Sequence, residues 1–218
     1  MKKLILIIAV LFCISPLAAE AVTGPADVAE AAKVGLKHFL DLIPAGSRQE
    51  YGFTQTDPLG KAYLGDPYNL HMITPDALFS YSEGVPVASI LTVIDQWYFP
   101  VMIQDKIRCF LIVDRMDNKW EAVSLGYATL ARSMNQVRAD WPAEKGYNPV
   151  LIAVFQAKKY LVMIPEAGEV LLSLSPGQTA SGPGPAASGS GQAPSGSGQV
   201  ANILESLKPT VREAIKQR

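Results

Sequence analysis

The feature that most constrains the fold is a group of three short apolar segments between Trp97 and Leu125. The segments cover residues 98–104, 107–113 and 120–125, are rich in β-branched and aromatic residues, and are separated by polar tips. This pattern predicts a three-stranded antiparallel meander. The middle segment is apolar at both odd and even positions, so we expect other layers to cover both faces of the sheet. Pro100 has no N–H to donate to a neighbouring strand, so the first strand is expected to be an edge or a bulged strand.

Two helical patterns and a second meander surround this sheet. Apolar residues recur at helical spacing over residues 26–43, where Pro25 suits the first turn, and again over residues 127–138. Three further apolar segments, residues 150–155, 160–164 and 169–174, predict the second meander. This order of elements predicts an α+β domain in which two helices pack on a mostly antiparallel sheet.

The chain between the first helix and the first meander is less regular. Residues 49–54 and 68–73 are expected to be strands, and Thr74 followed by Pro75 predicts a capped helical turn. Residues 87–94 are expected to form a strand or another buried segment that leads into the meander.

Residues 1–21 match a secretory signal peptide. Two lysines precede an apolar run, and Ala19 and Ala21 suit a cleavage site. Cys13 follows the bulky Phe12, which does not suit lipoprotein processing. We therefore expect an exported protein, periplasmic or extracellular, with no transmembrane span after cleavage. The net charge after cleavage is about −2, which gives no indication of nucleic-acid binding.

The composition changes abruptly after the second meander. Residues 176–199 consist almost entirely of Ser, Gly, Pro, Ala and Gln, a low-complexity composition that cannot bury enough apolar surface to order itself. The expected organisation is a globular domain over residues 22–175, a flexible linker over 176–199 that spans roughly 25–30 Å, and an amphipathic helix over 200–218.

The C-terminal segment places its apolar side chains on one helical face. These candidate binding residues are Val200, Ile203, Leu204, Leu207, Val211 and Ile215. Pro209 is expected to kink this helix or to begin a second one. The apolar face could dock on a protein or cell-envelope partner, on a second copy of the chain, or on the protein's own domain, because the linker is long enough for all three.

Few residues qualify as catalytic candidates. Cys109 is the single cysteine outside the leader, and its place on the more apolar face of a strand indicates a buried, inert thiol. His71, the better placed of the two histidines, would need Cys109 or a carboxylate such as Asp95 or Asp114 beside it to act in catalysis. No motif of a hydrolase, a phosphate loop, a dinucleotide site or a metal site is present, and we expect no metal or cofactor.

Aromatic residues and an acidic tip offer two further binding possibilities. Trp141 and Tyr147 lie in a predicted loop between prolines, where exposed rings could contact a carbohydrate or another ligand. Asp114, Asp117 and Asn118 cluster at a tip but lack the ligand spacing of an EF-hand, so an ordinary turn is the preferred interpretation.

The absence of catalytic motifs, together with the linker and the amphipathic tail, favours an exported, non-catalytic binding module. In this hypothesis the C-terminal helix docks on a protein or envelope partner. The alternative hypothesis is a secreted hydrolase-type enzyme that uses His71 with an acidic or thiol partner. No pattern in the sequence identifies the ligand or the partner.

Overall fold

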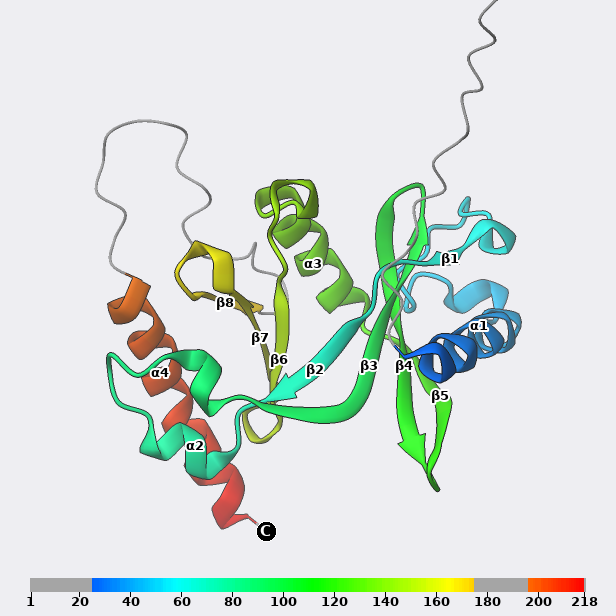
Figure 1. Ribbon diagram of the computed structural model, residues 1–218. Helices are drawn as coiled ribbons and strands as arrows, with labels where there is room; N and C mark the ends of the chain where they lie inside the picture. The colour runs from blue at the N-terminus through cyan, green and yellow to red at the C-terminus, as the bar shows by residue number, and fades with distance from the viewer. Residues whose placement is uncertain (1–24, 175–195, 218) are drawn as a thin grey trace, which may run out of the picture.

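The computed structural model describes residues 25–174 and 196–217. The expected signal peptide and the part of the expected linker before Gly196 lie outside the described residues. The helices are α1 (Ala26–Asp41), α2 (Pro75–Ser80), α3 (Ala128–Asp140) and α4 (Gly196–Lys216). The strands are β1 (Tyr63–Leu64), β2 (Tyr68–Met72), β3 (Thr92–Ile103), β4 (Lys106–Met116), β5 (Lys119–Gly126), β6 (Val150–Val154), β7 (Lys159–Ile164) and β8 (Val170–Leu174) (Figure 1). Short 3₁₀ helices cover Ala45–Ser47, Leu59–Lys61, Val87–Ile90, Ala143–Lys145, Phe155–Ala157 and Pro165–Ala167.

The strands form one eight-stranded sheet in the order β5-β4-β3-β2-β6-β7-β8, and β1 also pairs with β3. The β2–β6 pair is parallel and joins two residue pairs, His71 with Ile152 and Met72 with Ala153. The other strand pairs are antiparallel. The sheet therefore consists of two meanders, β3–β5 and β6–β8, that meet through β2 at a short parallel seam. The α+β fold class and both predicted meanders are confirmed.

Both hairpin tips of the first meander have two consecutive residues with positive φ. These are Gln104 and Asp105, and then Asp117 and Asn118. Two positive φ values in a two-residue loop are typical of a type I′ turn, whose twist matches that of the flanking strands. The acidic tip is thus a hairpin turn, as preferred from the sequence.

β3, the strand that contains Pro100, is central and bulged, so of the two expected alternatives, an edge or a bulged strand, the bulged one is present. β1 and β2 are interrupted over residues 65–67, opposite Pro100, and Gly65 donates its N–H to the Pro100 carbonyl at 2.8 Å. In an antiparallel strand the N–H and C=O of one residue point to the same side, so the missing donor of Pro100 faces this interruption. The expected bulge is present next to it, between Val101 and Met102.

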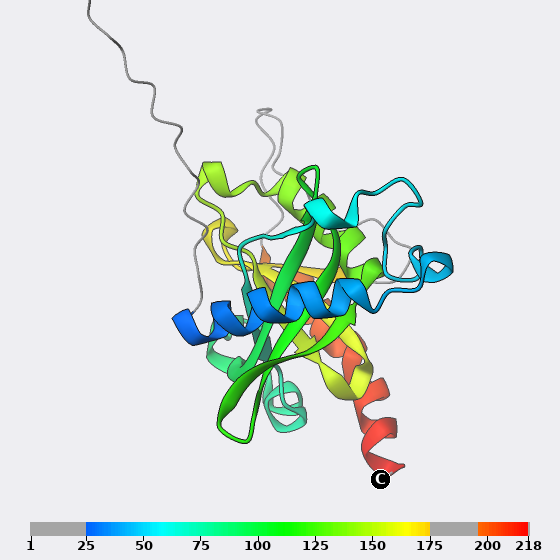
Figure 2. The same cartoon turned by 90° about the vertical axis from the view of Figure 1, so that its right-hand side faces the viewer.

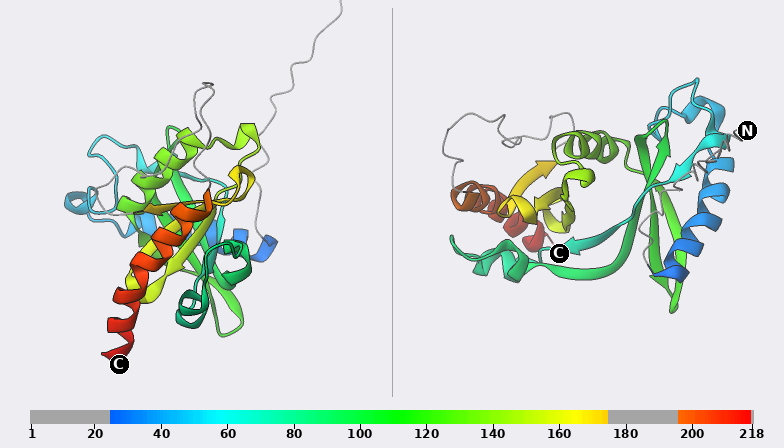
Figure 3. Two further views of the ribbon diagram at one scale, coloured as in Figure 1. Left: turned by 90° about the vertical axis from the view of Figure 1, so that its left-hand side faces the viewer. Right: turned by 45° about the horizontal axis from the view of Figure 1, so that its top comes forward.

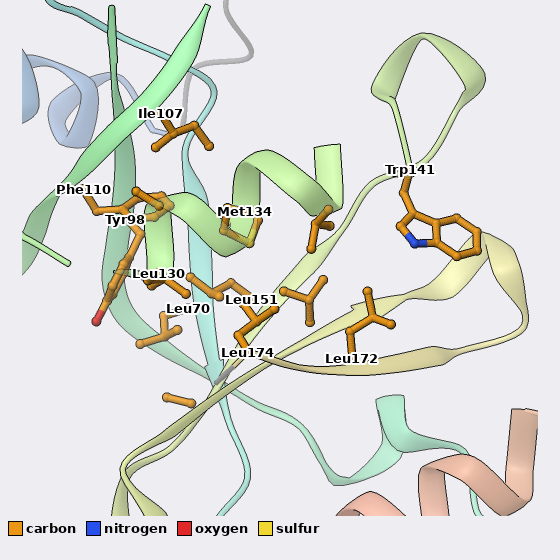
Figure 4. Close-up of a cluster of buried hydrophobic side chains, with 14 of the residues drawn as sticks. Leu70, Tyr98, Ile107, Phe110, Leu130, Met134, Trp141, Leu151, Leu172 and Leu174 are labelled. Carbon is orange, nitrogen blue, oxygen red and sulfur yellow. The ribbon is translucent and has the colours of Figure 1, made fainter. Parts of the chain in front are cut away.

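The two faces of the sheet bury different helices. α3 packs on one face, against a cluster of apolar side chains that both meanders contribute (Figure 4). α1 covers β4 and β5 on the opposite face, and α4 covers the second meander on that same face (Figure 3). α3 therefore covers both halves of the sheet on one face. On the other face, α1 covers the first meander and α4 covers the second.

α1 lies unusually close to the first meander, across whose strands it runs (Figure 2). A Cβ atom on Gly35 would lie only 2.1 Å from the Cβ of Ala122 on β5, so glycine permits this approach. Val28 and Ala32 are fully buried on the same side of the helix. The helix backbone at Gly35 therefore packs directly against the Ala122 methyl group of the sheet.

α4 packs on the protein's own domain. Four of its apolar residues, Val200, Leu204, Leu207 and Val211, are at most 7% exposed and join the core of the second meander. Burying each such side chain stabilises the fold by about 1.5–3 kcal/mol. The helix begins four residues earlier than expected, at Gly196, and continues past Pro209 to Lys216 without a second helix beginning there. Among the described helices none is long and apolar enough to cross a bilayer.

The expectations for the irregular region are confirmed in part. Residues 49–54 form turns and loop rather than a strand. Residues 87–94, expected to be a strand or a buried segment that leads into the meander, form the Val87–Ile90 3₁₀ helix and then the first residues of β3. β2 is present as expected, and Thr74 caps α2, where its Oγ1 accepts a hydrogen bond from the Ala77 N–H at 3.2 Å. A loop that packs against the sheet does not need a periodic sequence pattern. The sequence of residues 49–54 was therefore no reliable indication of a strand.

Candidate functional site

His71 and Cys109 lie far apart. His71 pairs with Val93 near one end of β3, whereas Cys109 pairs with Val101 near the other end. Eight residues of extended strand separate these positions, which corresponds to roughly 26 Å. The two side chains therefore do not form a nucleophile–base pair. Cys109 is buried as expected, and burial raises the pKa of its thiol, so the reactive thiolate is disfavoured.

The carboxylates considered as partners of His71 are engaged elsewhere. Asp95 lies on the surface, 3.4 Å from the guanidinium of Arg115. Asp114 accepts hydrogen bonds from Gln96 Nε2 at 2.9 Å and from the Arg115 backbone N–H at 2.7 Å. The Nδ1 atom of His71 lies 3.2 Å from the Asn69 carbonyl oxygen. Within the described residues no group of three or more His, Cys, Asp or Glu side chains is placed to hold a metal ion.

The expected aromatic binding surface is absent at Trp141. The indole is only 6% exposed and belongs to the cluster under α3, as Figure 4 shows. Tyr147 is half-buried and contacts the Trp141 ring edge-on, with 5.0 Å between ring centroids. The loop between the two prolines folds back onto the domain, so this pair stabilises the core and presents no open aromatic platform.

The candidate residues of the C-terminal helix separate into two groups. Val200, Leu204, Leu207 and Val211 are buried in the domain, and Ile203 is half-buried against them. Ile215 is 44% exposed near the end of the helix. The apolar stripe predicted to meet a partner is therefore mostly used within the chain, and its last member, Ile215, is the most accessible one.

A groove of about 510 Å³ lies between α2 and the C-terminal half of α4. Its walls are Phe79, Glu205, Lys208, Arg212, Ile215 and Lys216. The guanidinium of Arg212 lies over the Phe79 ring, 5.5 Å from its centroid, a distance suited to a cation–π contact. Lys208 and Lys216 pair with Glu205 and Glu213 on the same helix, whereas Arg212 has no carboxylate partner among the described residues.

A second groove, also of about 510 Å³, lies where β4 begins. It is lined by Gly52, Asp105, Lys106, Ile107, Arg108, Ala128, Arg132 and Asn135. The register of β3 and β4 shows that Arg108 is the extra residue of the bulge, because Cys109 pairs with Val101 and Ile107 with Met102. A bulge turns its extra side chain out of the regular alternation of the strand.

Asp57 forms an ion pair with the Arg108 side chain, which the bulge redirects. Its Oδ1 accepts a hydrogen bond from Arg108 Nη2 at 2.8 Å, and its Oδ2 accepts one from the Thr54 N–H at 2.7 Å. Asp57 is only 6% exposed, so this is a largely buried ion pair. The loop comes close to the strand, because a Cβ on Gly52, whose φ is +84°, would lie 2.1 Å from the Arg108 carbonyl oxygen.

Sequence reasoning did not find this second groove. Arg108 and Asp57 are 51 positions apart, and their contact depends on a bulge and on an irregular loop, neither of which has a periodic signature. The only sequence signal of this groove was the presence of polar residues at the start of β4, which is otherwise apolar. Polar residues are equally typical of an ordinary strand end.

Comparisons of the chain with models of protein families, with curated proteins and with solved structures find no match. The two grooves and the residues that line them are therefore the features that indicate a function.

Proposed function

We propose that this protein is an exported, non-catalytic binding module whose C-terminal helix contributes to the binding surface while packed on its own domain. The partner is a protein with an acidic, partly apolar segment that occupies the groove between α2 and α4. The observation that carries the proposal is Arg212, which lies over Phe79 with no carboxylate partner among the described residues.

The two sides of α4 have different roles in this proposal: one side anchors the helix on the domain, and the other side binds the partner. Val200, Leu204, Leu207 and Val211 hold the helix on the sheet, so its orientation is fixed before any partner arrives. The neighbouring stripe carries Lys208, Arg212 and Lys216 at intervals of four residues and therefore faces one direction. A preorganised binding surface loses less conformational entropy on association than a helix that must first fold.

The charges of the groove favour an acidic partner. Lys208 and Lys216 are each balanced by a glutamate of the same helix, which leaves the charge of Arg212 uncompensated. A guanidinium stacked on an aromatic ring still presents its N–H groups at the edge, where a carboxylate can bind in a bidentate manner. Phe79 and Ile215 supply an apolar contact beside it.

A hydrolase that uses His71 is not favoured by any contact in the structure. Its proposed thiol partner lies at the other end of β3, and its proposed carboxylate partners are bound to other groups.

The test is a binding measurement with two labelled peptides of equal length. One places glutamate and leucine at i, i+3, i+4 and i+7 spacings so that a helix would carry both on one face, and the other has lysine in place of glutamate. Fluorescence anisotropy with the full chain at low salt is expected to show at least 10-fold tighter binding of the acidic peptide. Arg212→Ala should weaken this binding at least 5-fold, and Arg212→Lys should weaken it less, because lysine keeps the charge but loses the bidentate geometry.

Lys145→Ala is the matched control, since it removes one positive charge from an exposed 3₁₀ helix outside the groove. Equal losses in Arg212→Ala and Lys145→Ala would mean that the peptide senses only net charge, and the proposal would be abandoned. Tighter binding to anionic lipid vesicles than to the acidic peptide, with the same dependence on Arg212, would replace the protein partner by a membrane surface.

A further inference from the structure

The groove at the β4 bulge has an excess of positive charge. Lys106, Arg108 and Arg132 line it together with one carboxylate, Asp105. Asp57 balances Arg108, so the three cations face two carboxylates within this region. Asp105 in turn accepts a hydrogen bond from the Tyr63 hydroxyl at 2.7 Å. One positive charge of the groove is therefore not compensated by any of these groups.

Arg108 also has unused hydrogen-bonding capacity. Its Nη2 bonds to Asp57, but its Nε is buried and has no partner among the described residues. A buried donor without a partner is unfavourable, and native proteins rarely leave one in that state. The Arg108 side chain as a whole keeps 18% of its surface exposed and lines the groove, so its guanidinium contributes positive charge there.

The beginning of α3 adds to the positive field of the groove. Ala128 lines the groove, and Tyr127, which precedes it with a φ of +63°, makes no capping hydrogen bond with its side chain. The first N–H groups of a helix carry a partial positive charge and favour an anion nearby. Asn135, about two turns further along α3, is engaged elsewhere, because its side chain bonds to both the N–H and the carbonyl of Ile107.

We infer that this groove binds the oxyanion group, phosphate or carboxylate, of a small molecule. Arg132 and Lys106 are the exposed cations that would contact the oxyanion, and Arg108 is held at the groove by Asp57. The volume of about 510 Å³ lies within the range of small-molecule sites, about 300–1,000 Å³, and leaves room for an organic molecule that carries the oxyanion. The site is separate in residues from the groove between α2 and α4, so neither proposal depends on the other.

The experiment titrates the full chain with three probes at constant ionic strength. Inorganic phosphate and glycerol phosphate represent the phosphate source, and succinate represents the carboxylate source. Saturable binding of at least one probe is expected in isothermal titration calorimetry, together with a rise in Tm that grows with probe concentration. Tighter binding of glycerol phosphate than of inorganic phosphate would support a phosphate ester, and preferential binding of succinate would support a carboxylate.

Arg132→Gln is the variant that tests the assignment, because Arg132 is exposed and its replacement leaves the core intact. This variant should weaken binding at least 5-fold. Arg138→Gln, an exposed arginine on the same helix that does not line the groove, should retain the affinity of the parent protein. The inference is overturned if none of the three probes binds saturably, or if both variants bind as the parent does.

Discussion

The two meanders of this protein share a topology but differ in regularity. β6, β7 and β8 pair without a register shift, and their outer face is closed by the apolar stripe of α4. The first meander contains shifts in both of its strand pairs, and a third shift lies between β2 and β3. The buried ion pair and the polar groove at β4 both occur in this irregular half. Within the sheet, the polar groove lies where the register of β3 and β4 is interrupted, because the bulge turns the charged Arg108 side chain away from the apolar faces.

The largest expected effect comes from removing the helix that closes the regular half. Deletion of residues 196–218 would expose the second meander's core to water, so we expect a sharp drop in Tm or insoluble protein. Differential scanning calorimetry of the two proteins tests this expectation. The result would contradict the comparison if the shortened protein melted at the parent temperature, since α4 would then be no part of the core.

A point variant measures the same contribution without shortening the chain. Leu204 is fully buried, so Leu204→Ala should lower the free energy of unfolding by about 2–5 kcal/mol. Thr210→Ala, at an exposed position of the same helix, should change it by less than about 0.5 kcal/mol. Urea unfolding of both variants provides the measurement, and equal stabilities would show that α4 packs only loosely.

The next effect concerns the irregular half. Asp57→Ala would leave the guanidinium of Arg108 largely buried without its partner, and we expect a loss of about 3 kcal/mol in urea unfolding. Because Arg108 keeps 18% of its side chain exposed, the loss should lie at the lower end of the range for buried pairs. Asp95→Ala, which breaks an exposed pair with Arg115, should cost less than about 1 kcal/mol. Similar losses in the two variants would mean that the bulge does not bury its ion pair.

The smallest effect probes the contact between the halves. The hydroxyls of Tyr98 on β3 and Tyr160 on β7 are 2.8 Å apart, and Figure 4 shows the Tyr98 oxygen directed away from the apolar cluster. Burial raises the pKa of Tyr160 from 10.0 to about 12, so the folded state retains this proton at a pH where the unfolded chain loses it. The associated stability is present below pH 10 and falls as the pH rises from 10 to about 12.

Tyr160→Phe should therefore reduce the alkaline loss of stability, measured as the free energy of unfolding between pH 9 and 11.5. Tyr51→Phe, which changes a tyrosine outside this contact, should leave the loss as it is in the parent protein. An identical pH dependence in all three proteins would mean that the hydroxyl contact between the halves is not maintained in solution.

The features that the sequence predicted are those that depend on local repetition. β-branched segments divided by turn residues located both meanders, and helical spacing located α1 and α3. The packing of α4 was left open, because an amphipathic face indicates that something covers it but not what. The exposure of Trp141 was predicted wrongly, since a loop aromatic can fold back onto a core that the sequence does not display.

The site at the β4 bulge depends on relations that a linear pattern does not contain. Arg108 alternates with apolar residues as any strand residue would, and Asp57 lies in a loop without periodicity. Their contact becomes visible only when the register of β3 and β4 is known. A site of this kind is therefore found from the strand register in a structure and not by searching the sequence for motifs.

The placement of α3 has a consequence for how the whole molecule unfolds. The seam between β2 and β6 has only two residue pairs and would by itself permit the halves to act as independent folding units. α3 buries side chains against Phe110 of one half and Leu151 of the other in one cluster, so separating the halves would strip the helix of its core on both sides. We therefore expect slow-exchanging amides in β4 and β7 to open together, as one cooperative unit, rather than half by half.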